Sequence, residues 1–186
     1  MSELEKLNDE FLFIYKDRLN DIIEFKKGQL CEDDYEGILL KSNCSWLLLQ
    51  EIKNSRFDGF SVHNHWDITS LIWDELKYPK LRSKLKQEDI DYGCEIAQKI
   101  DFEECDGEFN NILKSVNANF PAISIFLEKN IADEFFVLTD LDFVSDEAFI
   151  GSRINTDGEI DGKIILWYAN VTSIRFGSSY ENMLTR

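Results

Sequence analysis

The chain has only two histidines, His63 and His65, separated by one residue in the sequence RFDGFSVHNHWDITS of residues 56–70. In an extended strand both imidazoles would lie on one face, where two histidines can bind a metal ion or act in acid–base catalysis. Any mechanism that requires histidine must therefore use this strand. Asp67 follows two residues after His65, but no cysteine or further histidine lies close in the sequence.

The second half of the chain provides a comparison, because short matches recur in the same order: Asp58–Gly59 with Asp161–Gly162 and Thr69–Ser70 with Thr172–Ser173, 103 residues apart, and Ile52 with Ile154 and Tyr78 with Tyr180, 102 apart. These matches indicate an internal duplication. At a shift of 103, Leu166 corresponds to His63 and Tyr168 to His65. HNH nucleases spread their catalytic residues over a ββα motif rather than a contiguous tripeptide. We therefore interpret both histidines as structural or surface residues, with contact to a partner as the alternative.

A second candidate site is the acidic sequence NTDGEIDGKII of residues 155–165. Asp157, Glu159 and Asp161 fall at the first, third and fifth positions of an EF-hand loop, with Gly162 at the sixth. The twelfth position, which should be a bidentate Glu, is Tyr168, and no flanking helices are expected. We interpret the segment as a solvated hairpin turn.

Other catalytic signatures are absent from the sequence. It contains no G-x-S-x-G motif, no P-loop and no dinucleotide fingerprint, and none of its acidic residues stands out as a catalytic pair. The four cysteines, Cys31, Cys44, Cys94 and Cys105, form no C-x-x-C pair, and we expect them to be reduced and mostly buried. The sequence thus predicts a protein that is not an enzyme and holds no metal or cofactor.

The elements that carry these residues follow the same order twice. Leu4, Leu7, Phe11, Ile14 and Tyr15 have helical spacing, and residues 109–120 form the second helix candidate. After the first helix come DIIEF, YEGILL, SWLLLQEI, GFSVHNHW and DITSLIW; after the second come AISIF, EFFVLTDL, EAFIGSRI, KIILWYA and VTSIRF. Residues 75–86 look helical or irregular around Pro79. The sequence therefore predicts that each half is one helix followed by about five short antiparallel strands.

This order predicts an α+β, mainly β fold of two tandem Sm-like barrels, one over residues 1–87 and the other over residues 88–186. The halves resemble the Sm-like fold in element order alone, without a diagnostic Sm motif. The strand KIILWYA is apolar at successive positions, which predicts burial of both its faces.

The charge of the chain is its most informative bulk property. Asp and Glu number 36 against 20 Lys and Arg, a net charge of −16. That charge repels nucleic acid and anionic membranes and favours a basic protein partner. The acids cluster in residues 101–108 and 140–147, and we predict that they form a docking surface: Asp101, Glu103, Glu104, Asp106, Glu108, Asp140, Asp142, Asp146 and Glu147.

The sequence also carries a family resemblance, through Gly37–Ile38, Leu47–Leu49, Ile52, Asp58–Gly59 and Asp67–Thr69, with Asp161–Gly162 and Val171–Ser173 repeating part of the pattern. With these residues the chain resembles bacterial immunity proteins of contact-dependent growth inhibition systems, including partners of EndoU-type RNase toxins. The resemblance covers most of the chain and implies inhibition of a toxin. It assigns no functional residue.

We therefore expect a cytoplasmic immunity protein, or antitoxin, that binds and neutralises a basic nuclease toxin domain through an acidic surface. The acidic N-terminus is unlike a secretory signal, and the longest apolar runs are too short to span a bilayer. A general protein-interaction scaffold and an Sm-like RNA-binding module are the alternatives. The sequence does not indicate the oligomeric state.

Overall fold

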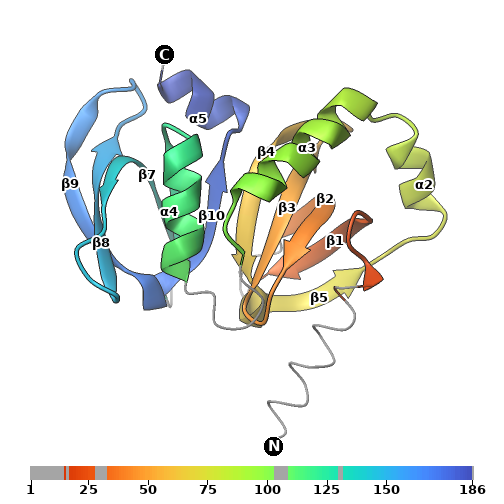
Figure 1. Cartoon of the computed structure of the whole chain (residues 1–186), viewed down its shortest axis with the longest axis horizontal. Helices are drawn as coiled ribbons and strands as arrows, with labels where there is room; N and C mark the ends of the chain where they lie inside the picture. The colour runs from red at the N-terminus through yellow and green to blue at the C-terminus, as the bar shows by residue number, and fades with distance from the viewer. Residues whose placement is uncertain (1–14, 16, 28–32, 103–108, 130–131, 186) are drawn as a thin grey trace, which may run out of the picture.

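The computed structural model of the chain describes residues 15, 17–27, 33–102, 109–129 and 132–185. Ten strands form one open antiparallel sheet in the order β5-β1-β2-β3-β4-β10-β6-β7-β8-β9 (Figure 1). The strands are β1 (Ile22–Lys27), β2 (Asp33–Ser42), β3 (Trp46–Lys53), β4 (Arg56–Asn64), β5 (Ile68–Ile72), β6 (Ile123–Lys129), β7 (Ala132–Asp142), β8 (Ala148–Ile154), β9 (Ile160–Trp167) and β10 (Val171–Phe176). The helices are α2 (Lys77–Arg82), α3 (Gln87–Lys99), α4 (Phe109–Asn119) and α5 (Ser179–Leu184), with 3-10 turns η1 (His65–Asp67) and η2 (Tyr168–Asn170).

All ten predicted strands are present, which confirms the mainly β class. The predicted helix over residues 109–120 is α4, and α2 lies within the segment that was ambiguous around Pro79. Neither α3 nor α5 was predicted from the sequence. The predicted N-terminal helix lies outside the described residues except for Tyr15, which is buried against Ile23 and Phe25.

The internal repeat is visible in the topology. In each half the fifth strand pairs with the first, and the first to the fourth follow in order: β5-β1-β2-β3-β4 and β10-β6-β7-β8-β9. A 3-10 turn precedes the fifth strand at positions 103 residues apart, and a short helix, α2 or α5, follows it at positions 102 apart. The third and fourth strands of the two halves also pair in equivalent register. Leu48 pairs with Val62, and the residues 102 and 103 positions later, Ile150 and Ile165, pair with each other.

The two halves are joined as one sheet. β4 pairs antiparallel with β10, with Val62 opposite Ile174 and Phe60 opposite Phe176. The sheet is therefore continuous rather than two separate five-stranded units, and β5 and β9 are its two edges. Because α3 packs across β2 of the first half, it spans the predicted boundary between residues 87 and 88 without marking it; that boundary stays a prediction.

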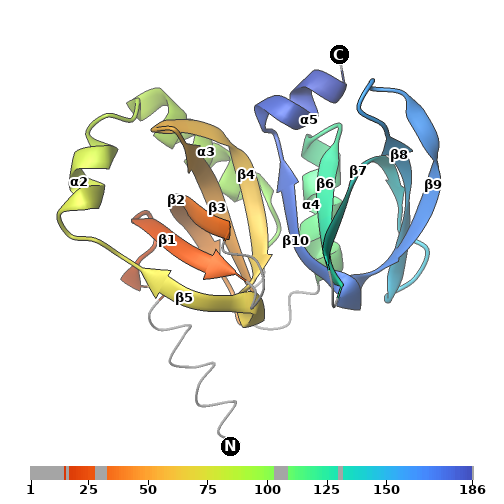
Figure 2. The ribbon, with the colours of Figure 1, turned by 180° about the vertical axis from the view of Figure 1, so that it is seen from behind.

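α3 and α4 lie on the same side of the curved sheet and contribute to one core cluster. Figures 1 and 2 show α3 on one side of β2, β3 and β4, and α4 against the second half. Ile112, Leu113 and Val116 of α4 are buried in one core cluster with Phe149 and Leu166 of the second-half strands. α5 covers a smaller region, where Leu184 packs with Ala122 and Val137.

Candidate protein-interaction site

The histidine strand is part of the core of the first half. His63 is 1% exposed, and its ring lies 4.9 Å from that of Phe25 and 4.6 Å from that of Tyr35, measured between centroids. Its Nε2 lies 2.8 Å from the hydroxyl of Ser61. Burial, together with the charge of Lys27, lowers the pKa of His63 well below its ordinary value. A neutral imidazole packed between aromatic rings is a structural residue, and Leu166 takes its place in the second half.

The acidic loop of residues 155–165 forms the hairpin turn that the sequence predicts. Asn155 Oδ1 accepts hydrogen bonds from the backbone N–H groups of Asp157 (3.0 Å) and Glu159 (2.9 Å), and Gly158 has φ of +81°. Among the described residues, no group of three or more His, Cys, Asp or Glu side chains is placed to hold a metal ion. Cys44 and Cys94 are half-buried rather than buried, and Cys31 and Cys105 lie outside the described residues.

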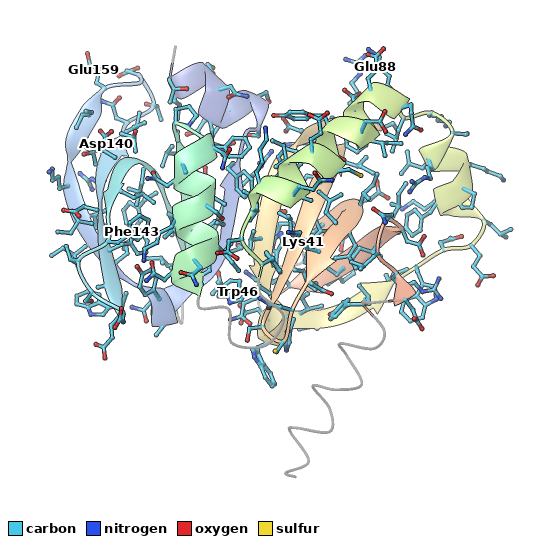
Figure 3. The ribbon with its side chains drawn as sticks, viewed as in Figure 1. Lys41, Trp46, Glu88, Asp140, Phe143 and Glu159 are labelled. Carbon is cyan, nitrogen blue, oxygen red and sulfur yellow. The ribbon has the colours of Figure 1, made fainter. Side chains whose placement is uncertain are left out.

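The predicted docking residues fall in two places. Asp101, exposed, follows α3, and its N–H donates to Ser115 Oγ of α4 (2.9 Å). Glu103, Glu104, Asp106 and Glu108 lie outside the described residues. Asp140, Asp142, Asp146 and Glu147 are all exposed, and Figure 3 shows Asp140 at the end of the molecule opposite Glu88 of α3. Only this second group is therefore fully described, and the site is built on it.

The backbone of the turn between β7 and β8 is hydrogen-bonded beside the end of β9. Ser145 Oγ accepts from the N–H groups of Glu147 (3.2 Å) and Ala148 (3.1 Å), and the carbonyl of Glu147 accepts from Tyr168 N (3.0 Å). Ala148 is in turn the partner of Trp167 in the sheet register. The acids of the turn thus lie next to the end of β9.

The strand beside them exposes large apolar side chains. Ile165 is 51% exposed and Trp167 is 54% exposed, and because alternate residues share a face, both point to the same side of β9. Ile150 of β8 is the direct partner of Ile165 and is half-buried. The prediction that this strand is buried on both faces is wrong: Leu166 faces the core, while β9 is an edge strand with one uncovered face.

The first half shows why this is unusual, because the counterpart of that face is covered. Leu48 and Val62 correspond to Ile150 and Ile165, and both are fully buried. The cover is α3: Gln50 Nε2, on the same face as Leu48, donates to the carbonyl of Asp89 (2.7 Å), and the ring of Tyr92 lies 5.8 Å from that of Phe60. No described helix lies in the corresponding place over β8 and β9.

We call this uncovered region the second-half face. It consists of the apolar residues Ile150, Ile165 and Trp167 and the carboxylates Asp142, Asp146 and Glu147. Asp142 belongs to it because it pairs directly with Ile150 across β7 and β8. An exposed apolar patch with a charged rim is typical of protein-interaction sites. Nothing in the sequence alone distinguished Ile165 and Trp167 from core residues; the missing signal was the absence of a covering helix.

A second group of charged side chains, at the β4–β10 junction, forms ion pairs and hydrogen bonds within the protein. Arg175 lies 3.1 Å from a carboxylate oxygen of Glu51 and 2.8 Å from one of Asp58, while the buried Glu181 accepts from Ser124 Oγ at 2.6 Å. Burial raises the pKa of Glu51, although Arg175 opposes that shift. A cavity of about 350 Å³ adjoins these residues. Because each of them already has partners, we assign the group a structural role between the halves.

The basic residues also cluster. Lys77, Lys80, Arg82, Lys84 and Lys86 follow one another without an acid. A cavity of about 490 Å³ is lined by Arg56, Lys84 and Lys86 and also by Asp89. The acidic chain thus has a basic region on its first half.

Comparisons with protein-family models, with curated proteins and with solved structures find no match. None of the described helices is long and apolar enough to cross a bilayer.

Proposed function

We propose that the protein is an immunity protein that neutralises a basic nuclease toxin domain in the cytoplasm, and that the second-half face is part of its binding surface. The observation that carries the proposal is the combination of exposed Ile165 and Trp167 with the adjoining carboxylates of Asp142, Asp146 and Glu147, in a chain of net charge −16. The apolar side chains would supply affinity on burial, and the carboxylates would select a basic partner.

A nuclease domain is a suitable partner because it must present Lys and Arg side chains to bind phosphates. An inhibitor that offers carboxylates to the same side chains competes with the nucleic acid. Charges of opposite sign also raise the association rate, which matters when an inhibitor must bind before the nuclease acts. In this proposal the protein has no catalytic role and needs no cofactor.

We also propose that the two halves are Sm-like units. The duplicated strand order, the helix before β6 and the short helix after each fifth strand support this reading. The fold does not decide the function, because one architecture serves many binding roles. The Sm-like fold therefore does not support the immunity proposal by itself, and the second-half face is what supports it.

The test is a pull-down of the tagged protein from its native cells at low and moderate salt, with bound protein and RNA both identified. We expect a basic nuclease domain whose capture weakens as salt rises. The variant Asp142→Lys, Asp146→Lys and Glu147→Lys should lose capture and protection of cells against that domain. Its matched control reverses three exposed acids away from this face, Glu75 before α2 and Asp91 and Glu95 of α3, with the same change in net charge, and should keep both capture and protection.

Two other results would replace the proposal. RNA recovered in place of protein would favour an Sm-like RNA-binding module, for which the basic cavity lined by Arg56, Lys84 and Lys86 is the supporting observation. A partner that is not a toxin would make the protein a general interaction scaffold. Equal loss of capture in both charge variants would show that only the net charge matters.

A further inference from the structure

The first half contains a complete example of how this sheet receives a helix. Leu48, Gln50, Phe60 and Val62 share one face of β3 and β4, because they alternate along their strands and pair as Leu48↔Val62 and Gln50↔Phe60. α3 lies across that face and packs closely, since Gly93 leaves no room for a Cβ beside the Gln50 side chain. The covered face is apolar at its centre, with Leu48 and Val62 both fully buried.

The second half repeats the face without the helix. Ile150, Ser152, Lys163 and Ile165 take the four positions, with the pairs Ile150↔Ile165 and Ser152↔Lys163. The two central positions stay apolar, as Ile150 and Ile165 in place of Leu48 and Val62, yet Ile165 is half exposed. Among the described residues, the only helix on this side is α5, whose Leu184 packs with Ala122 and Val137 instead. The two central apolar positions that α3 covers in the first half are therefore uncovered here, with Ser152 and Lys163 in the places of Gln50 and Phe60.

One charge on the face is reversed between the halves. Lys41 pairs with Leu48 in the register, and its ammonium donates to the carbonyl of Ile100, the C-terminal cap of α3, at 2.9 Å. Figure 3 shows Lys41 near that end of α3. The residue that pairs with Ile150 in the same way is Asp142. A cation stabilises the C-terminal end of a helix, whereas a carboxylate stabilises the N-terminal end.

We propose that the second-half face binds an amphipathic helix of the partner, in the place that α3 occupies on the first half but with the opposite direction. Its apolar side lies on Ile150, Ile165 and Trp167, its N-terminal end lies at Asp142, and its flank carries Lys or Arg against Asp146 and Glu147. The inference rests on the proposed function only for the partner being basic. Helix recognition by a groove or face with spaced apolar anchors is a common mode of binding.

The experiment uses the full-length protein and a synthetic peptide of residues 87–100, the sequence of α3, in which Glu88, Asp89, Asp91 and Glu95 are replaced by Lys. Amide chemical shifts of the ¹⁵N-labelled protein are followed during titration. We expect saturable shifts in β8, β9 and the β7–β8 turn, and a paramagnetic label at the peptide N-terminus should broaden Asp142 more than a label at its C-terminus does. A scrambled peptide of the same composition should give no saturable shifts.

Two variants make the result specific. Ile165→Glu should weaken binding at least tenfold, while Leu76→Glu, a control at the most exposed apolar residue of the first half, should leave it unchanged. Unchanged amide spectra away from the substitution confirm that each variant is folded. In Asp142→Lys the C-terminal label should broaden the signal of residue 142 more than the N-terminal label does. The peptide should then bind in the opposite direction, because the face has the charge that Lys41 gives the first half.

Three outcomes would overturn the inference: equal binding of the scrambled peptide, binding that survives Ile165→Glu, or a dimer of the free protein that Ile165→Glu dissociates, which would make the face a contact between copies. The proposed function fails separately. If the peptide binds as described but cells yield no basic nuclease domain, the helix site stands and the immunity role does not. If a nuclease domain is captured equally by wild type and Ile165→Glu, the immunity role stands and the helix site does not.

Discussion

His63 occupies a position in the first-half core that the second half fills with Leu166. The imidazole is held neutral there, since burial lowers the pKa of His63 well below its ordinary value and lowers that of His65 to about 4. A histidine that titrates normally only when unfolded makes the unfolded state bind more protons below its ordinary pKa of 6.5. Protonation of either histidine therefore favours the unfolded state.

We predict that the free energy of unfolding falls as the pH is lowered from 6.5 towards 4. Each histidine contributes a slope of up to about 1.4 kcal/mol per pH unit. His63→Leu, which copies the second half, should remove its share of that slope. Urea unfolding of wild type and variant at pH 7.5, 6 and 5 measures the difference, in which the carboxylates common to both proteins cancel. Parallel pH profiles would contradict the assignment.

Arg175 is the cation that pairs with two carboxylates at the β4–β10 junction. It is 22% exposed and contacts Glu51 and Asp58, which are 16% and 18% exposed. We predict that Arg175→Met lowers the free energy of unfolding by about 3 kcal/mol, because it leaves two partly buried carboxylates without their cation. Burial already raises the pKa of Glu51, so the loss should be larger at pH 8 than at pH 5.

Thermal and urea unfolding test this prediction against two further variants. Addition of Glu51→Gln to Arg175→Met should recover part of the loss. Arg153→Met breaks the exposed ion pair with Asp161 and should cost less than about 1 kcal/mol. A cost for Arg175→Met as small as that for Arg153→Met would mean that the junction does not depend on its charges.

At the scale of elements, the strands were predictable and two helices were not. The ten apolar runs and the turn at Asn155 are local patterns, whereas the 3-10 turns η1 and η2 were not predicted. The sequence contains the capping box of α5, Ser178 with Glu181. It was missed because a helix of six residues has too few turns to show a clear helical spacing of apolar residues. Burial of β9 was mispredicted because exposed apolar residues on an edge strand have the same sequence pattern as core residues. The cover of a face is a tertiary property.

The packing of α3 gives an element-scale prediction at Gly93. A Cβ there would overlap Oε1 of the buried Gln50. Overpacking costs about 1–3 kcal/mol, and alanine favours a helix over glycine by about 1 kcal/mol, so we expect Gly93→Ala to destabilise the protein by up to about 2 kcal/mol. Combining it with Gln50→Ser, the residue of the second half, should restore stability. Unfolding free energies of the two single variants and the double variant decide.

The β8–β9 hairpin gives a second prediction at the scale of elements. Asn155→Ala removes the acceptor of two backbone N–H groups and should lower the free energy of unfolding by about 1 kcal/mol, as loss of a comparable side-chain cap does.

The same loop should not bind calcium. Millimolar CaCl₂ and the same concentration of MgCl₂ should give the same melting temperature, for the wild type and for Asn155→Ala. A rise specific to calcium in the wild type, lost in Asp157→Asn, would restore the EF-hand interpretation.

At the scale of the whole molecule, the position of α3 bears on where the first half ends. Residues 1–87 would leave Leu48 and Val62 without their covering helix, whereas residues 1–100 retain it. We predict that the fragment 1–100 unfolds cooperatively and that 1–87 aggregates or melts without a transition. Circular dichroism and size-exclusion chromatography of both fragments measure this. Cooperative unfolding of 1–87 would instead support the predicted boundary after residue 87.

The uncovered face has a consequence for how such a protein changes over evolutionary time. Leu48 and Val62 are tied to α3, so their substitution carries a folding cost. Ile165 and Trp167 have no such internal tie on their exposed side, and substitutions there leave the native state nearly as stable as before. The repeated surface is thus fixed by internal packing in one half and free of that constraint in the other, so substitutions on the second-half face can alter the binding that we propose for it while the fold stays the same.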